Sequence, residues 1–235
     1  MRPNQADVIR FGLMVKMLWR QLLRFGFWLL YNPFAWSYDL VSWTVSLGQW
    51  RHWQRTAMPF LHGRDLLEIG HGPGHLLLEL RQMGYRLVGV DLSPFMGRMA
   101  ARRLHRAGLT VPLLRCRAEQ LPLAAAAFDT VLATFPAPFI FEAATLAAVR
   151  RVLRPEGRFI IVLGAEQVGR RPLQRFVSWL FYLTGQGPLR PADSVEPDLP
   201  PRLTAVFAAA GFNLAGHYVQ LPTSRVLILL AHSSG

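Results

Sequence analysis

The chain has 235 residues, a hydrophobic fraction of 51% and a formal net charge of +12 at pH 7. This length suits one domain with extensions, and the hydrophobic fraction argues against a disordered chain. The single cysteine, Cys116, excludes an intramolecular disulfide and a CxxC metal site. The charge favours an anionic partner, such as nucleic acid, a membrane surface or an acidic substrate.

Residues 1–61 are predicted to form an amphipathic, aromatic helical extension. Lys16, Arg20 and Arg24 recur every four residues, so they form one basic stripe on a helix that is otherwise apolar. No uncharged window there reaches the ~20 residues that a spanning helix needs. A basic stripe among aromatic side chains suits a helix in the lipid headgroups, so we expect peripheral membrane contact through residues 8–31. The alternative is a helix that covers the domain while its cations face water.

A glycine turn is the most informative segment, within LLEIGHGPGHLLLEL at 66–80. An apolar strand with Glu68 near its end runs into Gly70, Gly72 and Gly74, and a leucine-rich helix follows. Such a unit lets a ligand approach the backbone and directs a helix N-terminus at an anionic group. A dinucleotide fingerprint needs its third glycine three places after the second, where this chain has a histidine. The pattern E-x-G-x-G-x-G instead suits the amino-acid end of S-adenosylmethionine.

The next predicted strand, RLVGVD at 86–91, ends in a carboxylate. In doubly wound sheets an acid at the tip of the second strand accepts hydrogen bonds from ribose hydroxyls. Asp91 has this position, and its alternative role is a helix N-cap. The adjoining glycine turn favours ribose binding.

Strands and helices alternate along the rest of the chain, which predicts an α/β fold with a mostly parallel sheet. Strands are expected at 65–69, 86–91, 111–116, 128–134, 157–163, 212–220 and 225–231, and helices at 74–83, 94–107, 142–153 and 201–210. The last two strands would form an antiparallel hairpin that completes a seven-stranded sheet. Residues 62–235 are therefore predicted to be one Rossmann-like, doubly wound domain. A proline-rich insertion on its substrate side, 165–200, would hold a short aromatic helix at 175–183.

This arrangement resembles the class I S-adenosylmethionine-dependent methyltransferases over residues 36–232. RAEQLPLAAAAFD at 117–129 is similar to the family's D-A-E-x-L-P-F…F-D, RRVLRPEGRFII at 150–161 to its R-V-L-K-P-G-G segment, and AAAGF at 208–212 to its A-G-F. YDLVSWTVSLGQWRHW at 38–53 resembles the lead-in of ubiquinone/menaquinone biosynthesis methyltransferases. Related phospholipid and small-molecule methyltransferases open in a similar way.

The resemblance implies contacts with the methionine end of S-adenosylmethionine. Gly70, Gly72 and Gly74 would lie against this moiety, with Glu68 beneath it. His71 would either meet the cofactor carboxylate or face solvent.

The other implied contacts lie along the nucleoside and the sulfonium. They are Asp91 at the ribose, Leu92 and Met96 along the adenosine, Ala118 and Glu119 beside the adenine, Phe135 beside the methyl group, and Tyr38 over the sulfonium. Arg117 replaces the family's adenine-contacting Asp or Asn, and a guanidinium cannot accept a hydrogen bond from the adenine amine. Backbone atoms or Glu119 would have to replace that contact.

Methyl transfer needs alignment of the acceptor with the sulfonium rather than a nucleophilic residue. A catalytic base is therefore left unassigned, with His52, His71 and Glu166 as candidates. No metal site is proposed.

The aromatic and basic residues around the predicted substrate side favour a lipophilic acceptor, such as a quinone precursor or a phospholipid. We expect a cytoplasmic enzyme, peripheral on the inner face of the membrane. The charge prompts an RNA methyltransferase as one alternative, but TFPAP at 134–138 differs from the N/D-P-P-Y of base-amine methylators, so nucleic acid is not favoured. Arg117 prompts another alternative, a non-catalytic protein that keeps this fold for binding.

Overall fold

The computed structural model describes residue 46 and residues 48–167 and 197–233. The predicted N-terminal helix, Tyr38, the aromatic helix at 175–183 and most of the insertion lie outside the described residues. No helix within the described ranges is long and apolar enough to cross a membrane.

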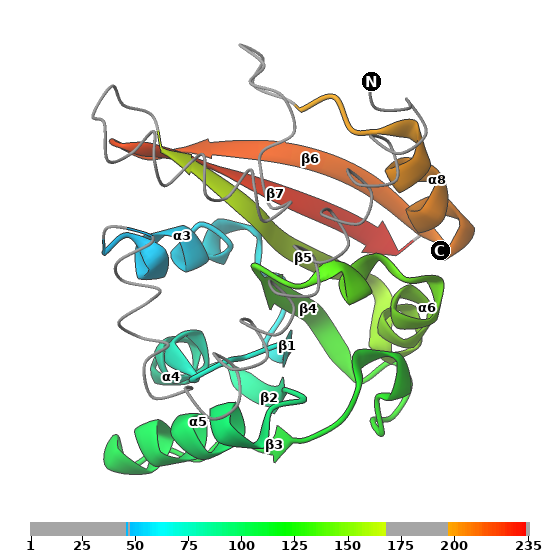
Figure 1. Ribbon diagram of the computed structural model, residues 1–235. Helices are drawn as coiled ribbons and strands as arrows, with labels where there is room; N and C mark the ends of the chain where they lie inside the picture. The colour runs from blue at the N-terminus through cyan, green and yellow to red at the C-terminus, as the bar shows by residue number, and fades with distance from the viewer. Residues whose placement is uncertain (1–45, 47, 168–196, 234–235) are drawn as a thin grey trace, which may run out of the picture.

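The described chain forms an α/β fold around a seven-stranded sheet in the order β3-β2-β1-β4-β5-β7-β6 (Figure 1). The strands are β1 Asp65–Ile69, β2 Arg86–Val90, β3 Leu113–Leu114, β4 Phe128–Thr134, β5 Leu153–Gln167, β6 Phe212–Gln220 and β7 Ser224–Ser233. The helices are α3 Trp50–Arg55, α4 His75–Gln82, α5 Pro94–Arg106, α6 Ala143–Val152 and α8 Pro201–Ala209, with 3-10 turns η2 Met58–Phe60, η3 Ala118–Gln120 and η4 Pro138–Phe141. Strands β1 to β5 pair in parallel, and β7 is antiparallel to both β5 and β6. The predicted fold class is confirmed.

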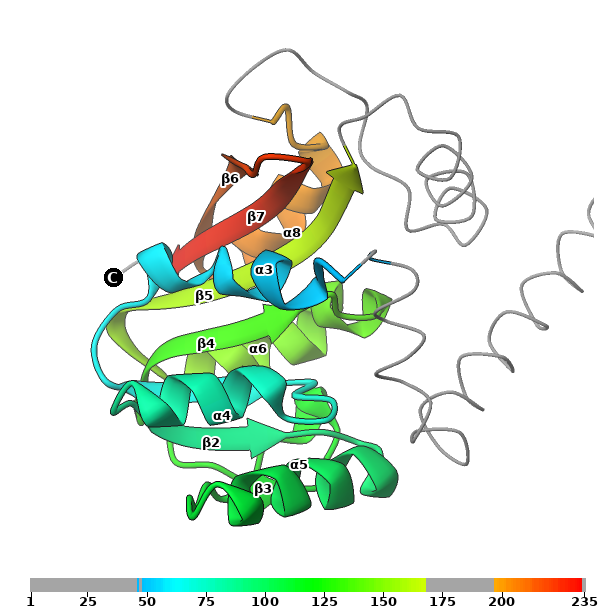
Figure 2. The same ribbon diagram turned by 90° about the vertical axis from the view of Figure 1, so that its left-hand side faces the viewer.

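Helices cover both faces of the sheet, as Figures 1 and 2 show. Helices α3, α4 and α5 lie on one face, and α6 and α8 lie on the other. Each face has its own buried apolar cluster, because parallel strands covered on both sides bury their residues in both directions. Val131 and Leu132, neighbours in β4, belong to opposite clusters.

Two strands differ in length from their predicted ranges. Strand β3 has only two residues instead of the expected 111–116. Pro112 lies just before it and has no N–H to donate, although its carbonyl accepts from Gly89 at 2.9 Å. Strand β5 is longer than predicted because pairing with β7 continues to Gln167 and pairing with β4 resumes beyond an irregularity at 154–157. Glu156 has φ of 62° at this irregularity, a conformation that glycine adopts more readily.

Helix α3 joins the predicted extension to the domain core. The sequence predicts a helical extension over residues 1–61, and the described part of this range forms α3 and the short turn η2. Trp53 is 1% exposed, and its indole N–H donates to Ser224 Oγ of β7 at 2.9 Å. Gln49, just before α3, accepts hydrogen bonds from Thr223 and Ser224 at 2.9 Å each. These contacts fix α3 over the β5–β7 part of the sheet.

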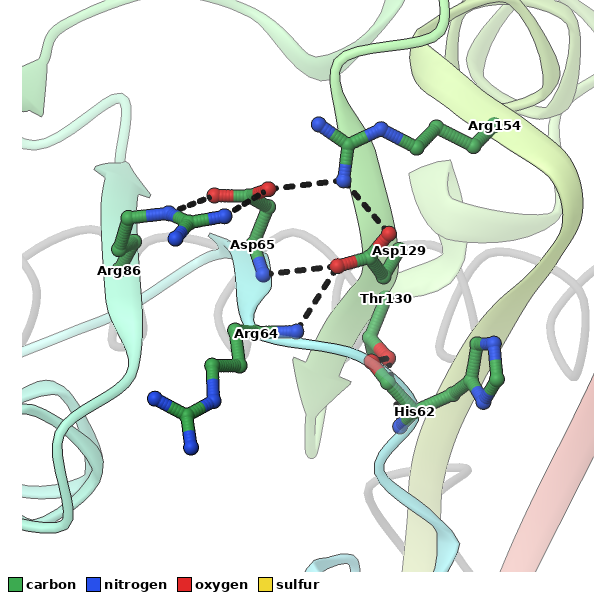
Figure 3. A network of polar contacts seen from close by, with 7 residues as sticks. All are labelled: His62, Arg64, Asp65, Arg86, Asp129, Thr130 and Arg154. Carbon is green, nitrogen blue, oxygen red and sulfur yellow. Dashed lines mark hydrogen bonds and ion pairs between the residues drawn. The ribbon is translucent and has the colours of Figure 1, made fainter.

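Charged side chains tie the amino ends of the central strands together (Figure 3). Arg154 of β5 donates to Asp65 of β1 at 2.7 Å and to Asp129 of β4 at 2.6 Å. Arg86 of β2 donates to both carboxylate oxygens of Asp65 and holds the pKa of that carboxyl well below its ordinary range. Asp129 also accepts the backbone N–H groups of Arg64 and Asp65 at 2.8 and 3.0 Å. This network lies at the edge of the sheet opposite the carboxyl ends of the strands.

Asp129→Ala should lower the free energy of unfolding by about 2–3 kcal/mol, because two backbone N–H groups and Arg154 lose their acceptor. Urea unfolding of the variant and the parent measures this difference. Asp198→Ala is the matched control, since Asp198 is exposed and has no ion pair within the described ranges. Equal stability of the Asp129 variant and the parent would contradict the assigned role of this network.

Candidate functional site

The order in which the chain adds strands to the sheet reverses between β1 and β4. The chain runs from β1 outward to β2 and β3, then returns to place β4 and β5 on the other side of β1. In open α/β sheets, ligands bind beyond the carboxyl ends of the strands at such a switch point. The loop after β1, the tip of β2 and the residue after β4 therefore border the candidate site.

The glycine turn after β1 has the backbone conformation that its sequence predicts. Gly70, Gly72 and Gly74 have φ values of 72°, 53° and 77°, in the left-handed region that favours glycine. A Cβ at Gly70 or Gly72 would meet no atom of the described residues within 4 Å, so the backbone there borders space that these residues leave open. A Cβ at Gly74 would lie 2.7 Å from Cβ of Ala100, so this glycine lets α4 approach α5. The turn therefore has an open part at its first two glycines and a closely packed part at its third.

Backbone hydrogen bonds attach this turn to the neighbouring strand. The N–H groups of Gly70 and His71 donate to the carbonyl of Val90, the last residue of β2, at 2.7 and 3.3 Å. Gly74 then serves as the N-cap residue of α4, and its carbonyl accepts from Leu78 at 3.1 Å. The turn is thus held between the end of β2 and the start of α4.

Asp91 holds the same turn through its side chain. Its Oδ2 accepts the backbone N–H of Gly72 at 2.9 Å, and its Oδ1 accepts the backbone N–H of Ser93 at 2.8 Å. The alternative role of Asp91 as a helix N-cap is wrong, because Ser93 is the N-cap of α5 and accepts from the backbone of Met96. A carboxylate has about four acceptor positions, so Asp91 retains capacity for further donors such as hydroxyl groups.

Glu68 is a buried carboxyl group beneath the turn. It is 1% exposed, and neither carboxyl oxygen has a hydrogen-bond partner in the part of the chain that the structure describes. Burial raises the pKa of Glu68 to about 8, and the negative charge of nearby Asp91 adds to the rise. A carboxyl group of this kind would gain from a cationic or hydrogen-bonding ligand beside it.

His71 is buried rather than solvent-facing, so that alternative is wrong. The side chain is 4% exposed, and Nδ1 lies 2.7 Å from the carbonyl oxygen of Gly72. Because a carbonyl can only accept, Nδ1 carries the proton and Nε2 of the neutral ring is an acceptor. Burial lowers the pKa of His71, with the Asp91 charge opposing this effect, so the neutral ring is favoured. Its predicted contact with a cofactor carboxylate stays a prediction.

The residues predicted to lie along the adenosine and the adenine differ in their exposure to solvent. Leu92, beside Asp91, is 56% exposed, whereas Met96 is fully buried in α5 and contributes to the core in this structure. Ala118 is buried at the start of η3, and Glu119 follows it. The contacts of these residues with a nucleoside stay predictions.

Arg117, which replaces the family's adenine-contacting Asp or Asn, forms an ion pair with Glu119. Its guanidinium donates to Glu119 Oε1 at 2.6 Å. The pKa of Glu119 is lowered by a hydrogen bond from its own backbone N–H and by the Arg117 contact. The carboxylate that the sequence offers as a substitute acceptor for an adenine amine is therefore already paired with Arg117.

Phe135 follows β4 and lies under aromatic residues of α3. Its φ is 49°, and its N–H donates to the carbonyl of Val162 of β5 at 2.8 Å. The ring centroid of Phe135 lies 4.3 Å from that of Trp50 and 6.0 Å from that of Trp53. Gln54 of α3 also donates to Thr134 Oγ1 at 3.0 Å. An aromatic cluster of Trp50, Trp53 and Phe135 therefore borders the β4 side of the site. The sequence alone does not predict that Phe135 contacts these tryptophans, because they lie about 80 residues apart along the chain.

The candidate bases have different surroundings. His52 is exposed on α3, and His71 is buried in the turn. Glu166 accepts from Arg225 Nη2 at 3.0 Å near the end of β5. No group of three or more histidine, cysteine or acidic side chains within the described ranges could hold a metal ion.

Comparisons with known proteins agree with this geometry. Residues 67–161 match the family described as a methyltransferase domain. The chain is 29% identical over 163 residues to a demethylmenaquinone methyltransferase of Symbiobacterium thermophilum, covering 66% of this chain and 63% of the relative. It is 32% identical over 136 residues to a demethylmenaquinone methyltransferase of Mycolicibacterium paratuberculosis, covering 56% of each chain. The chain therefore spans less than two thirds of the length of these relatives.

A solved structure shares the fold. Geranyl diphosphate C-methyltransferase from Streptomyces coelicolor, in complex with Mg²⁺, geranyl diphosphate and S-adenosyl-L-homocysteine, has a TM-score of 0.55. Sequence identity is 13%, and the match covers 77% of this chain and 78% of that chain. At this identity the match supports the fold alone.

Glu68→Gln should remove a pH dependence of stability from the ligand-free protein. Unfolded Glu68 ionises near the ordinary glutamate pKa of 4.5 and folded Glu68 near 8, so the unfolded state binds fewer protons between these values and stability falls as pH rises. The variant should therefore gain stability relative to the parent by up to about 1.4 kcal/mol per pH unit, with no further gain above about pH 8. Urea unfolding at a series of pH values measures this difference.

Glu142→Gln is the control, because it removes a carboxyl group from an exposed position rather than a buried one. A constant difference between the Glu68 variant and the parent across this pH range would show that the carboxyl is ionised when buried.

Proposed function

We propose that this protein transfers a methyl group from S-adenosylmethionine to a lipophilic small-molecule acceptor at a membrane surface. Two findings support the proposal: residues 67–161 match a methyltransferase domain, and the order of the strands places a switch point beside the glycine turn. The observation that carries the proposal is the hydrogen bond from Gly72 N–H to Asp91. It joins the open glycine turn to the acid at the tip of β2. These are the two features that the methionine and ribose parts of the cofactor require.

The site suits this cofactor on the evidence of its own side chains. Gly70 and Gly72 leave open space where a Cβ would stand, and the orphaned carboxyl of Glu68 lies beneath them. Asp91 would accept hydrogen bonds from the ribose hydroxyls, and the protonated carboxyl of Glu68 would offer an acceptor oxygen to the ammonium group at the methionine end. When bound, S-adenosylmethionine supplies a methyl group activated by a sulfonium.

The protein's contribution to the reaction would be orientation and exclusion of water. The turn and Asp91 would fix the nucleoside, while the half-buried rings of Trp50 and Phe135, packed on the buried Trp53, would form an apolar border for the acceptor. A well-oriented encounter can contribute about 7–11 kcal/mol toward the barrier, so alignment alone is a substantial source of rate. We assign no catalytic base.

A quinone precursor is the acceptor class that we favour. The two similar proteins are named demethylmenaquinone methyltransferases, and the aromatic cluster suits a flat apolar ring. A phospholipid or similar lipid fits the same apolar border. The proposed membrane contact through residues 8–31 is supported by their basic and aromatic pattern alone.

Asp91→Ala should weaken binding of S-adenosylmethionine at least tenfold, because hydrogen bonds to a charged acceptor contribute about 1.5–3 kcal/mol each. Isothermal titration calorimetry on the full chain measures the affinity. Glu142→Gln provides a control on an exposed residue away from the glycine turn. If the Asp91 variant binds the cofactor as tightly as the parent, the assigned ribose contact is wrong.

Labelled methyl groups from S-adenosylmethionine should appear in the organic phase when the protein is incubated with a reduced demethylmenaquinone in detergent. The transfer should fall at least tenfold in Asp91→Ala at limiting cofactor, following the loss of affinity. A parallel incubation with phosphatidylethanolamine tests the phospholipid acceptor. Cofactor binding without transfer to either lipid, together with transfer to RNA, would refute the proposed acceptor class.

A further inference from the structure

The outer side of α5 has an unusual concentration of cations. Figure 2 shows this helix beside β3 at one edge of the sheet. Its exposed residues include four that recur at spacings of three and four, and these lie on one side of a helix: Phe95, Arg98, Arg102 and Arg106. His105 is exposed next to them. We call these five residues the α5 face.

Among the described residues, no acid forms an ion pair with the arginines of the α5 face. The sequence of α5, PFMGRMAARRLHR, has no acidic residue. No ion pair within the described ranges involves Arg98, Arg102 or Arg106. Several other surface arginines do have carboxylate partners, as the pairs Arg55–Glu79 and Arg117–Glu119 show.

Helix electrostatics explain only part of this arrangement. The negative end of the helix dipole favours Arg106 in the last turn, but the positive end disfavours a cation near the start, where Arg98 lies. Like charges four residues apart also repel one another. The three arginines therefore oppose one another along the helix, and a negatively charged surface would relieve this repulsion.

By sequence, the two longer segments outside the described residues do not have an excess of acids. Residues 1–45 contain five lysines or arginines and two acids, and residues 168–196 contain four arginines and two acids. Both segments are positive overall. Charge complementarity therefore favours a partner other than this chain.

We propose that the α5 face docks the protein on an anionic lipid surface. Two apolar residues favour lipid over nucleic acid at the start of α5: Leu92 is 56% exposed and Phe95 is 36% exposed. The guanidinium of Arg98 lies 4.4 Å from the ring centroid of Phe95, so a cation and an aromatic ring are presented together. Such a pair suits the boundary between headgroups and acyl chains.

The rest of the face suits the headgroups themselves. Ala101, Arg102, His105 and Arg106 border a shallow, open depression of the surface. Three of these side chains are basic, and guanidinium groups bind phosphates through charge-assisted hydrogen bonds. Leu92 also adjoins Asp91, so docking through α5 would bring the candidate cofactor site near the lipid. This inference rests on the proposed function, because a lipophilic acceptor is the reason that the site would need to lie near a lipid surface.

The test is partitioning of the full chain into vesicles of phosphatidylcholine with and without phosphatidylglycerol. R102Q/R106Q should reduce partitioning into the anionic vesicles about thirtyfold, since each cation near an anionic leaflet contributes about 1 kcal/mol. R64Q/R202Q removes the same charge from two exposed positions outside α5 and should change partitioning less than about threefold. Phe95→Ser should weaken binding to anionic vesicles without changing its salt dependence.

Two outcomes would overturn the proposed docking through the α5 face. One is that R102Q/R106Q partitions into anionic vesicles like the parent. The other is that R64Q/R202Q loses as much partitioning as R102Q/R106Q, because net charge alone would then explain the binding. A loss of RNA binding in R102Q/R106Q, measured by filter retention, with unchanged vesicle binding would assign the face to nucleic acid instead. An unaltered affinity of R102Q/R106Q for S-adenosylmethionine shows that the variant is folded.

Failure of this inference can be separated from failure of the proposed function. Vesicle partitioning is measured without cofactor or acceptor, whereas methyl transfer is measured in detergent without vesicles. A parent protein that methylates the quinone acceptor but does not bind anionic vesicles overturns docking through α5 and leaves the proposed reaction standing.

Discussion

The site depends on one carboxylate that holds a glycine turn. Asp91 accepts the N–H of Gly72 from the loop after β1 and the N–H of Ser93 from the start of α5. It thereby joins two strand tips and the beginning of a helix. The turn needs this support because its glycines have left-handed backbone conformations and lie in open space on one side. Glycine supplies the conformation, and the acid beside it restricts its freedom.

The same carboxylate contributes to the pKa shift of the buried group beneath it. Glu68 lies in β1 and Asp91 directly follows β2, and burial, with a smaller contribution from the Asp91 charge, raises the pKa of Glu68 to about 8, which keeps this carboxyl protonated at neutral pH. The arrangement costs stability because the oxygens of Glu68 have no hydrogen-bond partner among the described residues. A ligand that donates a hydrogen bond to this carboxyl would remove part of this cost. The unsatisfied carboxyl therefore favours a hydrogen-bond donor at the same place where the glycines leave room for a ligand.

The sequence could predict features that depend on neighbours in the chain. Apolar runs and glycine turns located β1, α4 and β2 to within about two residues, and the glycine pattern indicated the turn itself. Lengths of edge strands were less predictable, since β3 is limited by Pro112 and β5 is extended by pairing with β7. Pairing of this kind depends on residues far along the chain.

Contacts between distant residues were the part of the site that sequence patterns could not provide. Asp91 was expected at a ribose, but its hydrogen bond to Gly72 depends on the parallel register of β1 and β2. The burial of His71 depends in the same way on the neighbouring strand, because its ring lies close to Gly89 of β2. The Arg117–Glu119 pair is local in sequence, yet neither residue type alone indicates that the two would neutralise one another rather than meet a ligand.

The two ends of the sheet divide stability from binding. At the amino ends, Asp65, Asp129 and Arg154 satisfy one another and leave little capacity for a ligand. At the carboxyl ends, Glu68 has no partner, and Phe135 is held at a φ of 49° against Trp50. A residue in this sparsely populated conformation costs of order 1–3 kcal/mol and persists only where its surroundings enforce it. The contacts that fix the strands at one end therefore allow unsatisfied and strained groups to persist at the other, where a ligand can use them.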